Sequence, residues 1–373
     1  MAMETISVVE QPIPVMEPIT RPYQPSWVDR LNDRVNRLPV PPWVFYLGLW
    51  LLLILIQSGS KWLDGVQSFG QLRWIYIFYT FYGVYFLAAI HYLDNWAKAA
   101  FNTFRPTLAV NEAEQSLLFY QLTTMPARTV GLLSAATLVS LIILIQPLII
   151  PLWKTMGFFH RSMAATLVDL GLFWFNALVV AVFVYHTLRQ LRWISRIHKT
   201  ATHINLFQIR PLYSLSGLTA RTGGILLLVG SIIGQQAGTH GEFTPDPYAL
   251  EMSSLFTLLS VVFYSLLAVA VFFLPLLGLH QLLLKEKERL QAEADSRLQA
   301  HIQELHRRID AHQLQDADAI NKHMASLALE RDIMVKLPTW PWQPGTLNLI
   351  LTAVLLPIIL WFMQQLLERW AGF

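Results

Sequence analysis

The carboxyl-terminal third of the sequence places a charged stretch between two long apolar runs. Residues 255–284 and 347–367 are each apolar and long enough to cross a bilayer, which takes about 20 residues at 1.5 Å per residue of helix. Residues 285–337, between them, are charged and rich in helix formers. Because both apolar runs belong in the membrane, the charged stretch has to leave the membrane and return. We therefore predict a helical hairpin that stands on the membrane, with its turn near residues 311–315.

The composition makes the whole chain an integral membrane protein. Of its 373 residues, 54% are hydrophobic and only 14% are charged, too few charges to cover a soluble surface of this size. The sequence has no Cys, which excludes disulfides, thiolate metal sites and thiol catalysis. The net charge of +3 is explained by membrane topology, so we expect no nucleic-acid partner.

Seven apolar segments are candidate membrane spans. They cover residues 43–57, 74–90, 130–153, 165–187, 223–237, 255–277 and 347–366. Most of the 27 Lys and Arg residues fall on one side of the membrane if the N-terminus lies inside. We therefore predict an all-α polytopic bundle in the plasma (inner) membrane, with seven spans, the N-terminus inside and the C-terminus outside. The hairpin then lies in the cytoplasm between spans six and seven.

The predicted domain order starts with a disordered tail and an amphipathic helix. The segments are a tail at 1–25, an interfacial helix at 26–40, spans one to six at 41–284 with cytoplasmic helix extensions at 91–128 and 188–221, the hairpin at 285–337, and the final span at 338–373. Ser26 is a plausible cap for the interfacial helix, whose apolar stripe is Trp27, Leu31, Val35 and Leu38. The stripe fits equally a helix in the membrane interface and a helix packed on the protein's own cytoplasmic domain.

Apolar residues in the hairpin have coiled-coil spacing. On the outgoing arm they are Leu298, Ile302, Leu305 and Ile309, and on the returning arm Ile320, Met324 and Leu327. Two arrangements satisfy this pattern: the arms pack on each other, or each arm packs on another subunit. The simpler arrangement pairs the two arms.

Asp169 is the only charged residue inside a predicted span. Asn176 follows seven residues later and therefore lies on the same helix face. Charged residues within spans are costly to bury and often mark function. Asp169 either reaches headgroups or water from the outer part of its span or belongs to a site for a coupling ion, and we favour the first interpretation.

The second predicted span is dense in aromatic residues. Tyr79, Tyr82 and Tyr85, together with Asp169 and Asn176, are candidates for a ligand cavity that faces the outer leaflet. The alternative, which we favour slightly, is an aromatic belt whose hydroxyls bond to neighbouring carbonyls.

Two further sets of span residues suggest packing or a pore. Gly230, Gly234 and Gly238 repeat every four residues, which lets two helix backbones approach closely. Asn348 and Thr352 lie one turn apart on the last span, where they either hold helices together or line a pore. Packing is the commoner outcome for such residues.

Signatures of catalysis are nearly absent. The sequence contains no His-Glu-x-x-His motif, no glycine-rich phosphate loop and no cluster of metal ligands. We therefore predict that the chain is not an enzyme and has no catalytic residues, no metal site and no cofactor.

The layout resembles the insect odorant and gustatory receptor superfamily of tetrameric cation channels. The shared features are seven spans, helices that continue into the cytoplasm, and a last helix split into a cytoplasmic half and a membrane half. That family's last span tends to begin with Thr-Tyr and to carry a later Gln-Phe, and residues 352–355 (Thr-Ala-Val-Leu) and 364–366 (Gln-Gln-Leu) correspond only loosely. The resemblance implies a channel and transfers no functional residue.

Three functions are consistent with these features. The first is a homo-oligomeric ion channel, held together by the hairpins and lined by Asn348 and Thr352 on the last span. The second is a membrane sensor or scaffold that signals through the hairpin to a cytoplasmic protein. A small-solute transporter ranks third, because transporters usually show more buried carboxylates or paired broken helices.

Overall fold

The computed structural model shows an all-helical chain. It describes residues 21–144 except 66 and 73, residues 163–200, 206–238 except 208, 259, 262–311 and 317–342, and, in the last segment, residues 345, 348, 351, 352, 354, 355, 359, 362, 363 and 366. Within these residues no strand occurs, and the one extended pairing is an isolated antiparallel bridge between Pro25 and Pro126. The predicted all-α class is confirmed.

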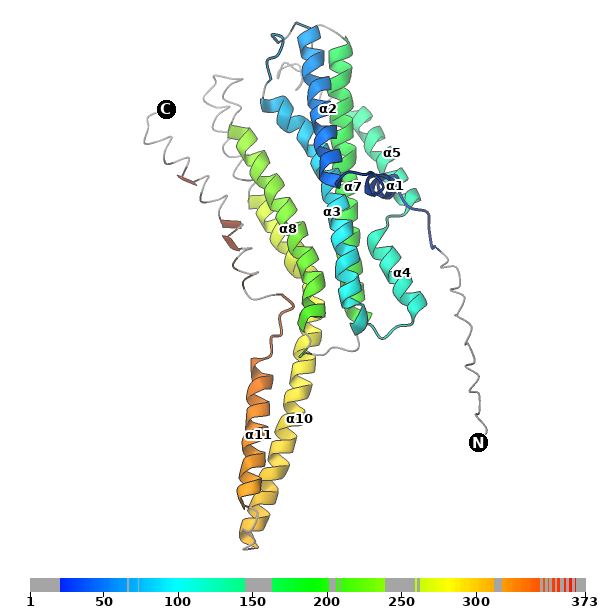
Figure 1. Ribbon diagram of the computed structural model, residues 1–373. Helices are drawn as coiled ribbons and strands as arrows, with labels where there is room; N and C mark the ends of the chain where they lie inside the picture. The colour runs from blue at the N-terminus through cyan, green and yellow to red at the C-terminus, as the bar shows by residue number, and fades with distance from the viewer. Residues whose placement is uncertain are drawn as a thin grey trace, which may run out of the picture.

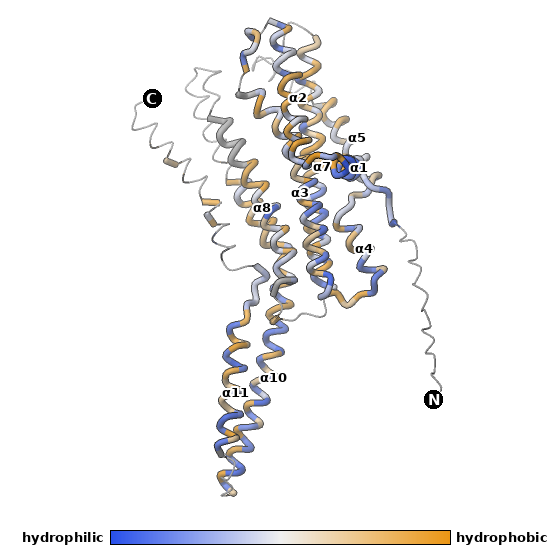
Figure 2. The backbone as a smooth tube through the Cα atoms, in the orientation of Figure 1, coloured by the Kyte–Doolittle hydropathy of each residue, from blue (hydrophilic) through white to orange (hydrophobic). Residues whose placement is uncertain are grey.

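Long helices form a bundle from which a hairpin projects at one end (Figure 1). The bundle contains α2 (Pro42–Leu63), α3 (Trp74–Phe104), α5 (Ala127–Leu144), α7 (Met163–Thr200) and α8 (Ile209–Gly238). Helix α3 is central, since it packs against α2, α7 and α8 and also against α4 (Glu112–Thr123). Apolar residues dominate the bundle, whereas polar residues are concentrated on the hairpin and on α1 (Figure 2).

Four helices are long and apolar enough to cross a membrane. They are Pro42–Leu63, Tyr76–Thr107, Met163–Thr200 and Val262–Asp310, and they contain the predicted spans 43–57, 165–187 and most of 74–90 and 255–277. The shorter apolar helix Ala127–Ile143 begins the predicted third span, whose remainder, 145–153, lies outside the described residues. The predicted fifth span, 223–237, is the second half of α8. The chain is thus an integral membrane protein.

Helix α1 (Trp27–Asn36) packs on the protein itself. Its buried residues are Val28, Asp29, Asn32 and Val35, whereas Leu38 of the predicted stripe is 43% exposed. Ser26 caps the helix as predicted: its hydroxyl accepts a hydrogen bond from the Asp29 N–H, and the Asp29 carboxylate accepts one from the Ser26 N–H. The second interpretation of this amphipathic helix, packing within the protein, therefore fits the structure.

Residues 21–25, which we had included in a disordered tail, are held against the loop between α4 and α5. The Tyr23 hydroxyl donates to the Thr124 carbonyl at 3.0 Å, and the Ala127 N–H donates to the Gln24 carbonyl at 2.9 Å. Arg189 of α7 donates to the Gln121 carbonyl at 2.6 Å and to the Tyr23 hydroxyl. The chain therefore enters the bundle at a fixed place. Residues 1–20 lie outside the described part.

Pro211 lies within the apolar segment 204–218, and the sequence predicts that it breaks this segment into two parts. Helix α8 is instead continuous through Pro211. Pro211 is the third residue of α8, so the backbone N–H that it lacks belongs to the first turn, where no intrahelical acceptor exists. The proline therefore sits where a helix tolerates it.

The predicted hairpin is confirmed. A helix over residues 262–273 passes through a 3₁₀ turn at Leu274–Leu276 into α10 (Leu277–Asp310), and α11 (Ala317–Lys336) returns beside α10. Helix α10 ends at Asp310 and α11 begins at Ala317, and residues 312–316 are outside the described part. The seam residues Leu298, Ile302, Leu305, Ile320, Met324 and Leu327 are half-buried, whereas Ile309 is 45% exposed.

Candidate functional site

A buried ion pair lies at the end of the bundle farthest from the hairpin. The Lys61 ammonium of α2 contacts the Asp169 carboxylate of α7, and their side chains are 0% and 4% exposed. The Gln57 amide also donates to Asp169 Oδ1, at 3.3 Å. Asp169 therefore does not reach headgroups or water, contrary to the interpretation that we favoured. A buried pair of this kind has to be hydrogen-bonded and well placed, because each desolvated charge costs several kcal/mol.

The face of α2 that carries Lys61 explains how the pair forms. Ile54, Gln57, Ser58 and Lys61 are all buried, and their spacing of three, one and three residues places them on one side of the helix. Helix α7 presents its own buried stripe at three- and four-residue spacing, in which Asp169 is the first polar residue. The two faces meet because α2 packs directly on α7.

Asn176, one of the predicted site residues, bridges to the backbone of α3. Its Oδ1 accepts from the Gly83 N–H at 2.6 Å, and its Nδ2 donates to the Tyr79 carbonyl at 3.0 Å. These two backbone groups are four residues apart and are the donor and acceptor of one regular helical hydrogen bond. A side chain inserted at such a point is a recognised cause of helix bending. Figure 1 shows α3 changing direction along its length.

The structure places the three predicted tyrosines on α3. The Tyr79 carbonyl bonds to Asn176, and the Tyr85 hydroxyl donates to the Ile225 carbonyl of α8 at 3.1 Å. Tyr85 therefore fits the alternative interpretation, in which hydroxyls join neighbouring helices. Tyr82 is half-buried on α3.

A second buried polar cluster lies nearer the hairpin, where α1 meets α3 and α7. Asp94 of α3 has Oδ1 at 2.8 Å from His186 Nε2 and accepts a hydrogen bond from Asn32 Nδ2 at 3.3 Å. Next to it, His91 Nδ1 is 3.0 Å from the Tyr46 hydroxyl, and its Nε2 is 2.9 Å from Asn36 Oδ1.

A polar cavity of about 140 Å³ opens beside this second cluster. Its walls carry charges of both signs and are formed by Arg21, Pro25, Asp29, Asn32, Asp33, His91, Asp94, Asn95, Lys98, Tyr120, Thr123 and Thr124. Burial, together with the nearby Asp94, raises the pKa of Asp29 to about 6. Asp29 is nevertheless held in place by the N–H groups of Ser26 and Met125, both at 2.9 Å from its Oδ2.

Sequence reasoning missed the partners of both clusters. We ended the first span at Gln57, and so assigned Lys61 to an outer loop, although the buried face of α2 continues through it. Asp94 and His186 each follow an apolar run, and we placed Asp94 in the cytoplasmic extension 91–128 and His186 at the inner end of the fourth span, 165–187. The sequence does contain a signal for these buried faces, because polar residues recur at helical spacing. They are Gln57, Ser58 and Lys61 on α2, and Asp169, Asn176, His186 and Gln190 on α7.

The base of the hairpin is fixed by polar and aromatic contacts. Lys287 of α10 donates to the carbonyls of Val335 and Leu337, at 2.6 and 2.8 Å, where α11 ends. The rings of His280 and Trp340 stack with centroids 3.7 Å apart and planes 5° from parallel. Trp342 stacks on Trp340 and packs against Phe272 and Phe273. The segment that follows α11 is thereby attached to α10 and to the helix over residues 262–273.

Ion pairs join the two arms farther along the hairpin. Arg331 Nε lies 2.8 Å from Asp295 Oδ1, and Arg297 Nη1 lies 3.7 Å from Glu330 Oε1. These contacts support the arrangement in which the arms pack on each other.

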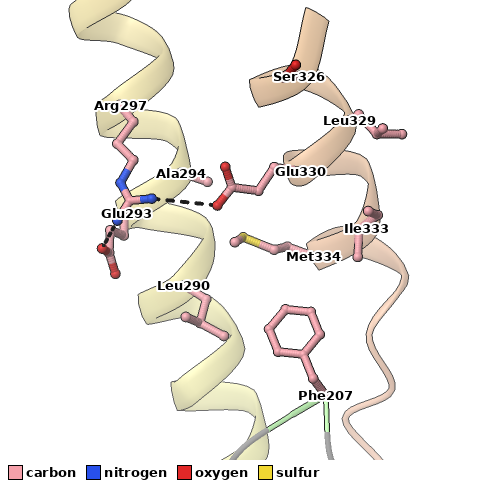
Figure 3. A pocket seen from close by; sticks show the side chains of 10 residues that line it. All are labelled: Phe207, Leu290, Glu293, Ala294, Arg297, Ser326, Leu329, Glu330, Ile333 and Met334. Carbon is pink, nitrogen blue, oxygen red and sulfur yellow. Dashed lines mark hydrogen bonds and ion pairs between the residues drawn. The ribbon is translucent and has the colours of Figure 1, made fainter. Parts of the chain in front are cut away.

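A groove of about 440 Å³ lies between the arms, and Figure 3 shows the side chains that line it. It is lined by Phe207, Leu290, Glu293, Ala294, Arg297, Ser326, Leu329, Glu330, Ile333 and Met334. Leu329 and Ile333 remain 61% and 46% exposed, so the hairpin keeps apolar surface after its arms have paired.

The other predicted residues lie apart from both buried clusters. Asn348 and Thr352 are exposed on the last segment. Gly230, Gly234 and Gly238 belong to α8, but the side-chain surroundings there lie outside the described residues. A close helix approach occurs instead at Gly223, where an added Cβ would stand 3.1 Å from the Ala268 carbonyl oxygen.

Comparison with known proteins adds no relative. No family model, no curated protein and no solved structure matches this chain. Within the described residues no three His, Cys, Asp or Glu side chains come close enough to hold a metal ion. The function of this chain is therefore inferred from its geometry alone.

Proposed function

We propose that this chain forms a homo-oligomeric ion channel, with seven spans, the N-terminus inside and a central pore lined by Asn348 and Thr352. The observation that carries the proposal is the exposure of the last span. Its described residues are exposed except Val354, and the apolar ones, Leu351, Leu355, Ile359, Phe362, Met363 and Leu366, are each about half exposed. A span covered so little by its own chain has surface available for neighbouring subunits.

Exposed apolar side chains on the hairpin also support assembly into an oligomer. Leu329 and Ile333 are large apolar side chains exposed on a polar, projecting element, and contiguous apolar surface of this kind marks interaction sites. The Trp340 and Trp342 contacts with His280 and Phe272 connect the hairpin to the start of the last span. Subunit contacts at the hairpin would therefore be coupled to the position of the pore-lining helix.

Assembly is tested by the mass of the full-length protein in nanodiscs. We expect the wild type to be oligomeric and the double variant Leu329→Glu, Ile333→Glu to shift toward monomer, since two charges would replace buried apolar contacts. His323→Glu, an exposed position on the same helix, is the matched control and should leave the mass unchanged. A monomeric wild type, or equal behaviour of both variants, contradicts the proposal.

Conduction is tested by cysteine accessibility, for which the Cys-free sequence is a ready background. We expect wild-type protein to conduct ions across planar bilayers, and Thr352→Cys to lose current when a charged thiol reagent is added. Leu132→Cys on α5, where the native side chain is 73% exposed, is the control that should not respond. Absence of current, or the same response at both positions, contradicts a pore lined by the last span.

The proposed orientation has its own test. A reporter inserted directly after Asp310, at the end of α10, should be found in the cytoplasm, because α10 carries six Lys and Arg residues and inner segments are enriched in these two residue types. A reporter detected at the outer face would contradict the orientation and leave the oligomer measurement unaffected.

A second candidate function is a membrane sensor or scaffold. The groove between the arms favours it, because an apolar cavity with a polar rim can receive a segment of a cytoplasmic protein. Deletion of residues 285–337 should then abolish capture of a defined cytoplasmic partner by the purified protein while the bundle remains folded. If the deletion changes subunit mass and no partner is found, the channel is the better description.

A further inference from the structure

The polar cavity of about 140 Å³ beside the second buried cluster has the charges of a binding site. It lies where residues 21–25 and α1 meet α3 and α4, and we call it the Asp29 cavity. The charged residues that line it are Arg21, Asp29, Asp33, Asp94 and Lys98. One chain supplies all of them, so a ligand would bind whether or not subunits assemble.

Asp29 provides an acceptor on the inner wall of the cavity. Its side chain lines the cavity and is only 7% exposed. Asp29 Oδ2 accepts hydrogen bonds from the Ser26 hydroxyl at 2.8 Å and from the N–H groups of Ser26 and Met125, each at 2.9 Å. Asp29 Oδ1 has no hydrogen-bond partner among the described residues. Buried polar atoms are nearly always hydrogen-bonded, so Oδ1 is available to a ligand.

Asp94 provides a second carboxylate on the same wall and is 4% exposed. Its Oδ1 lies 2.8 Å from His186 Nε2, and its Oδ2 accepts from Asn32 Nδ2 at 3.3 Å. An ionised carboxylate has about four acceptor sites, so both oxygens can accept again. Burial, together with the charge of Asp94, raises the pKa of Asp29 to about 6, which shows that the two carboxylates disfavour each other's charge. A cation with several N–H donors would satisfy both.

The outer wall of the cavity carries the opposite charge. Lys98 is half-buried and Arg21 is exposed, and neither forms an ion pair with another described residue. Asp33 is also exposed, so this outer wall has two cations and one carboxylate, whereas the inner wall has two carboxylates. The cavity is therefore negative at its buried end and positive at its accessible end.

The volume of the cavity limits the size of a ligand. Sites for drug-sized molecules occupy roughly 300–1,000 Å³. The Asp29 cavity, at about 140 Å³, has the volume of about five water molecules. A molecule as small as glycine, alanine or serine fits this volume.

We propose that the Asp29 cavity binds a small α-amino acid as a zwitterion, with its ammonium group toward Asp29 and Asp94 and its carboxylate toward Lys98 and Arg21. The ammonium group supplies three N–H donors for the carboxylate oxygens of the inner wall. The carboxylate pairs with the two cations of the outer wall. Binding requires no proton transfer and no covalent step.

This site goes beyond channel formation, because it assigns small-molecule binding to a single chain. That the ligand comes from the cytoplasm rests on the proposed orientation, which places residues 91–128 inside. Assembly and conduction are assigned to the hairpin and the last span. Loss of amino-acid binding with intact assembly, or the reverse, therefore distinguishes the two proposals.

The test is equilibrium dialysis of full-length protein in nanodiscs against radiolabelled glycine, alanine or serine. We expect at least one of the three to bind saturably. Methylamine and acetate each carry one of the two charged groups, so each should compete about tenfold less well than the unlabelled amino acid, or worse. Leucine is too large for the cavity and should not compete. No saturable binding of any of the three, or equal competition by methylamine, acetate or leucine, overturns the proposal.

Variants then locate the binding. Asp29→Asn should weaken it about tenfold or more, because a charged acceptor of the ammonium is lost. Lys98→Gln should lower the preference for the amino acid over methylamine, whereas a purely structural effect would weaken both ligands equally. Asp318→Asn and Lys322→Gln, at hairpin side chains that are 80% and 75% exposed, are the matched controls and should bind as wild type.

Each variant is used only if its helical circular dichroism and elution volume match those of the wild type. Asp29 also holds the Ser26 and Met125 N–H groups, so Asn95→Trp replaces Asp29→Asn if that variant does not fold. Asn95 is exposed and lines the cavity, and a large ring there should fill the space and abolish binding. Wild-type binding by folded Asp29→Asn or Asn95→Trp, or an unchanged preference in folded Lys98→Gln, overturns the assignment to this cavity.

Discussion

Removing one partner of the Lys61–Asp169 pair should destabilise the protein strongly. Both side chains are almost inaccessible, at 0% and 4% exposed, so either charge left behind would be buried in the bundle. Breaking a buried pair in this way costs about 3–5 kcal/mol, whereas replacing both partners by apolar residues of similar volume is close to neutral. We expect Lys61→Met and Asp169→Leu each to lose about that amount, and the double variant to lose less than either single variant.

The assay is reversible unfolding in mixed detergent micelles, followed by the helical circular dichroism signal. The three variants and the wild type form a double-mutant cycle, whose interaction term isolates the contribution of the pair. Single variants within about 0.5 kcal/mol of wild type, or strictly additive effects, would show that water or another group compensates the charge. Burial of the two charges would then not make the pair important for stability.

Four other predictions concern single substitutions and the pH dependence of stability. Gly83→Ala should cost about 1–3 kcal/mol, because its Cβ would stand 2.4 Å from a neighbouring ring carbon. Gly131→Ala, with nothing within 4 Å, should be neutral or gain about 0.5–1 kcal/mol in the same unfolding assay. Burial raises the pKa of Asp29 from 3.8 to about 6, so the folded state holds this proton more tightly and stability should fall as pH rises through that window. The loss is about 3 kcal/mol at most, and Asp29→Asn should flatten this part of the pH profile. Arg331→Ala and Asp295→Ala should each change stability by less than about 1 kcal/mol, since their side chains are 55% and 51% exposed.

The hairpin could be predicted because its cause is local in the sequence. A charged helix between two apolar runs is expected to return to the membrane, and α11 does turn back beside α10. The cap at Ser26 was equally local, since the side chain and the backbone groups that it satisfies lie within three residues.

The buried clusters could not be found in this way. Lys61 and Asp169 are 108 residues apart, and their pairing depends on how α2 and α7 rotate about their axes. Asp94 and His186, separated by 92 residues, present the same problem. Considered alone, each of these residues is predicted to contact solvent, because burying an isolated charge costs free energy. The partner that offsets the cost of burial becomes visible only when the buried faces of the two helices are packed together.

The Pro211 error has a different physical reason. Proline interrupts a helix only where its missing N–H would have had an acceptor, and the third residue of α8 is outside that region. We took the segment to begin at Ile204, whereas α8 begins at Ile209, so a residue of the first turn was taken for an interior one.

The 3₁₀ turn at Leu274–Leu276 separates the apolar helix over residues 262–273 from the long, charged helix α10. The His198 ring of α7 lies 3.3 Å from the Pro275 carbonyl oxygen and braces this point. From Leu277 to Asp310, α10 has 34 residues and therefore extends about 51 Å. A rotation of about 5° at the turn would carry the tip through about 4 Å over that length. Displacements too small to open the bundle would thus become large at the far end of the hairpin.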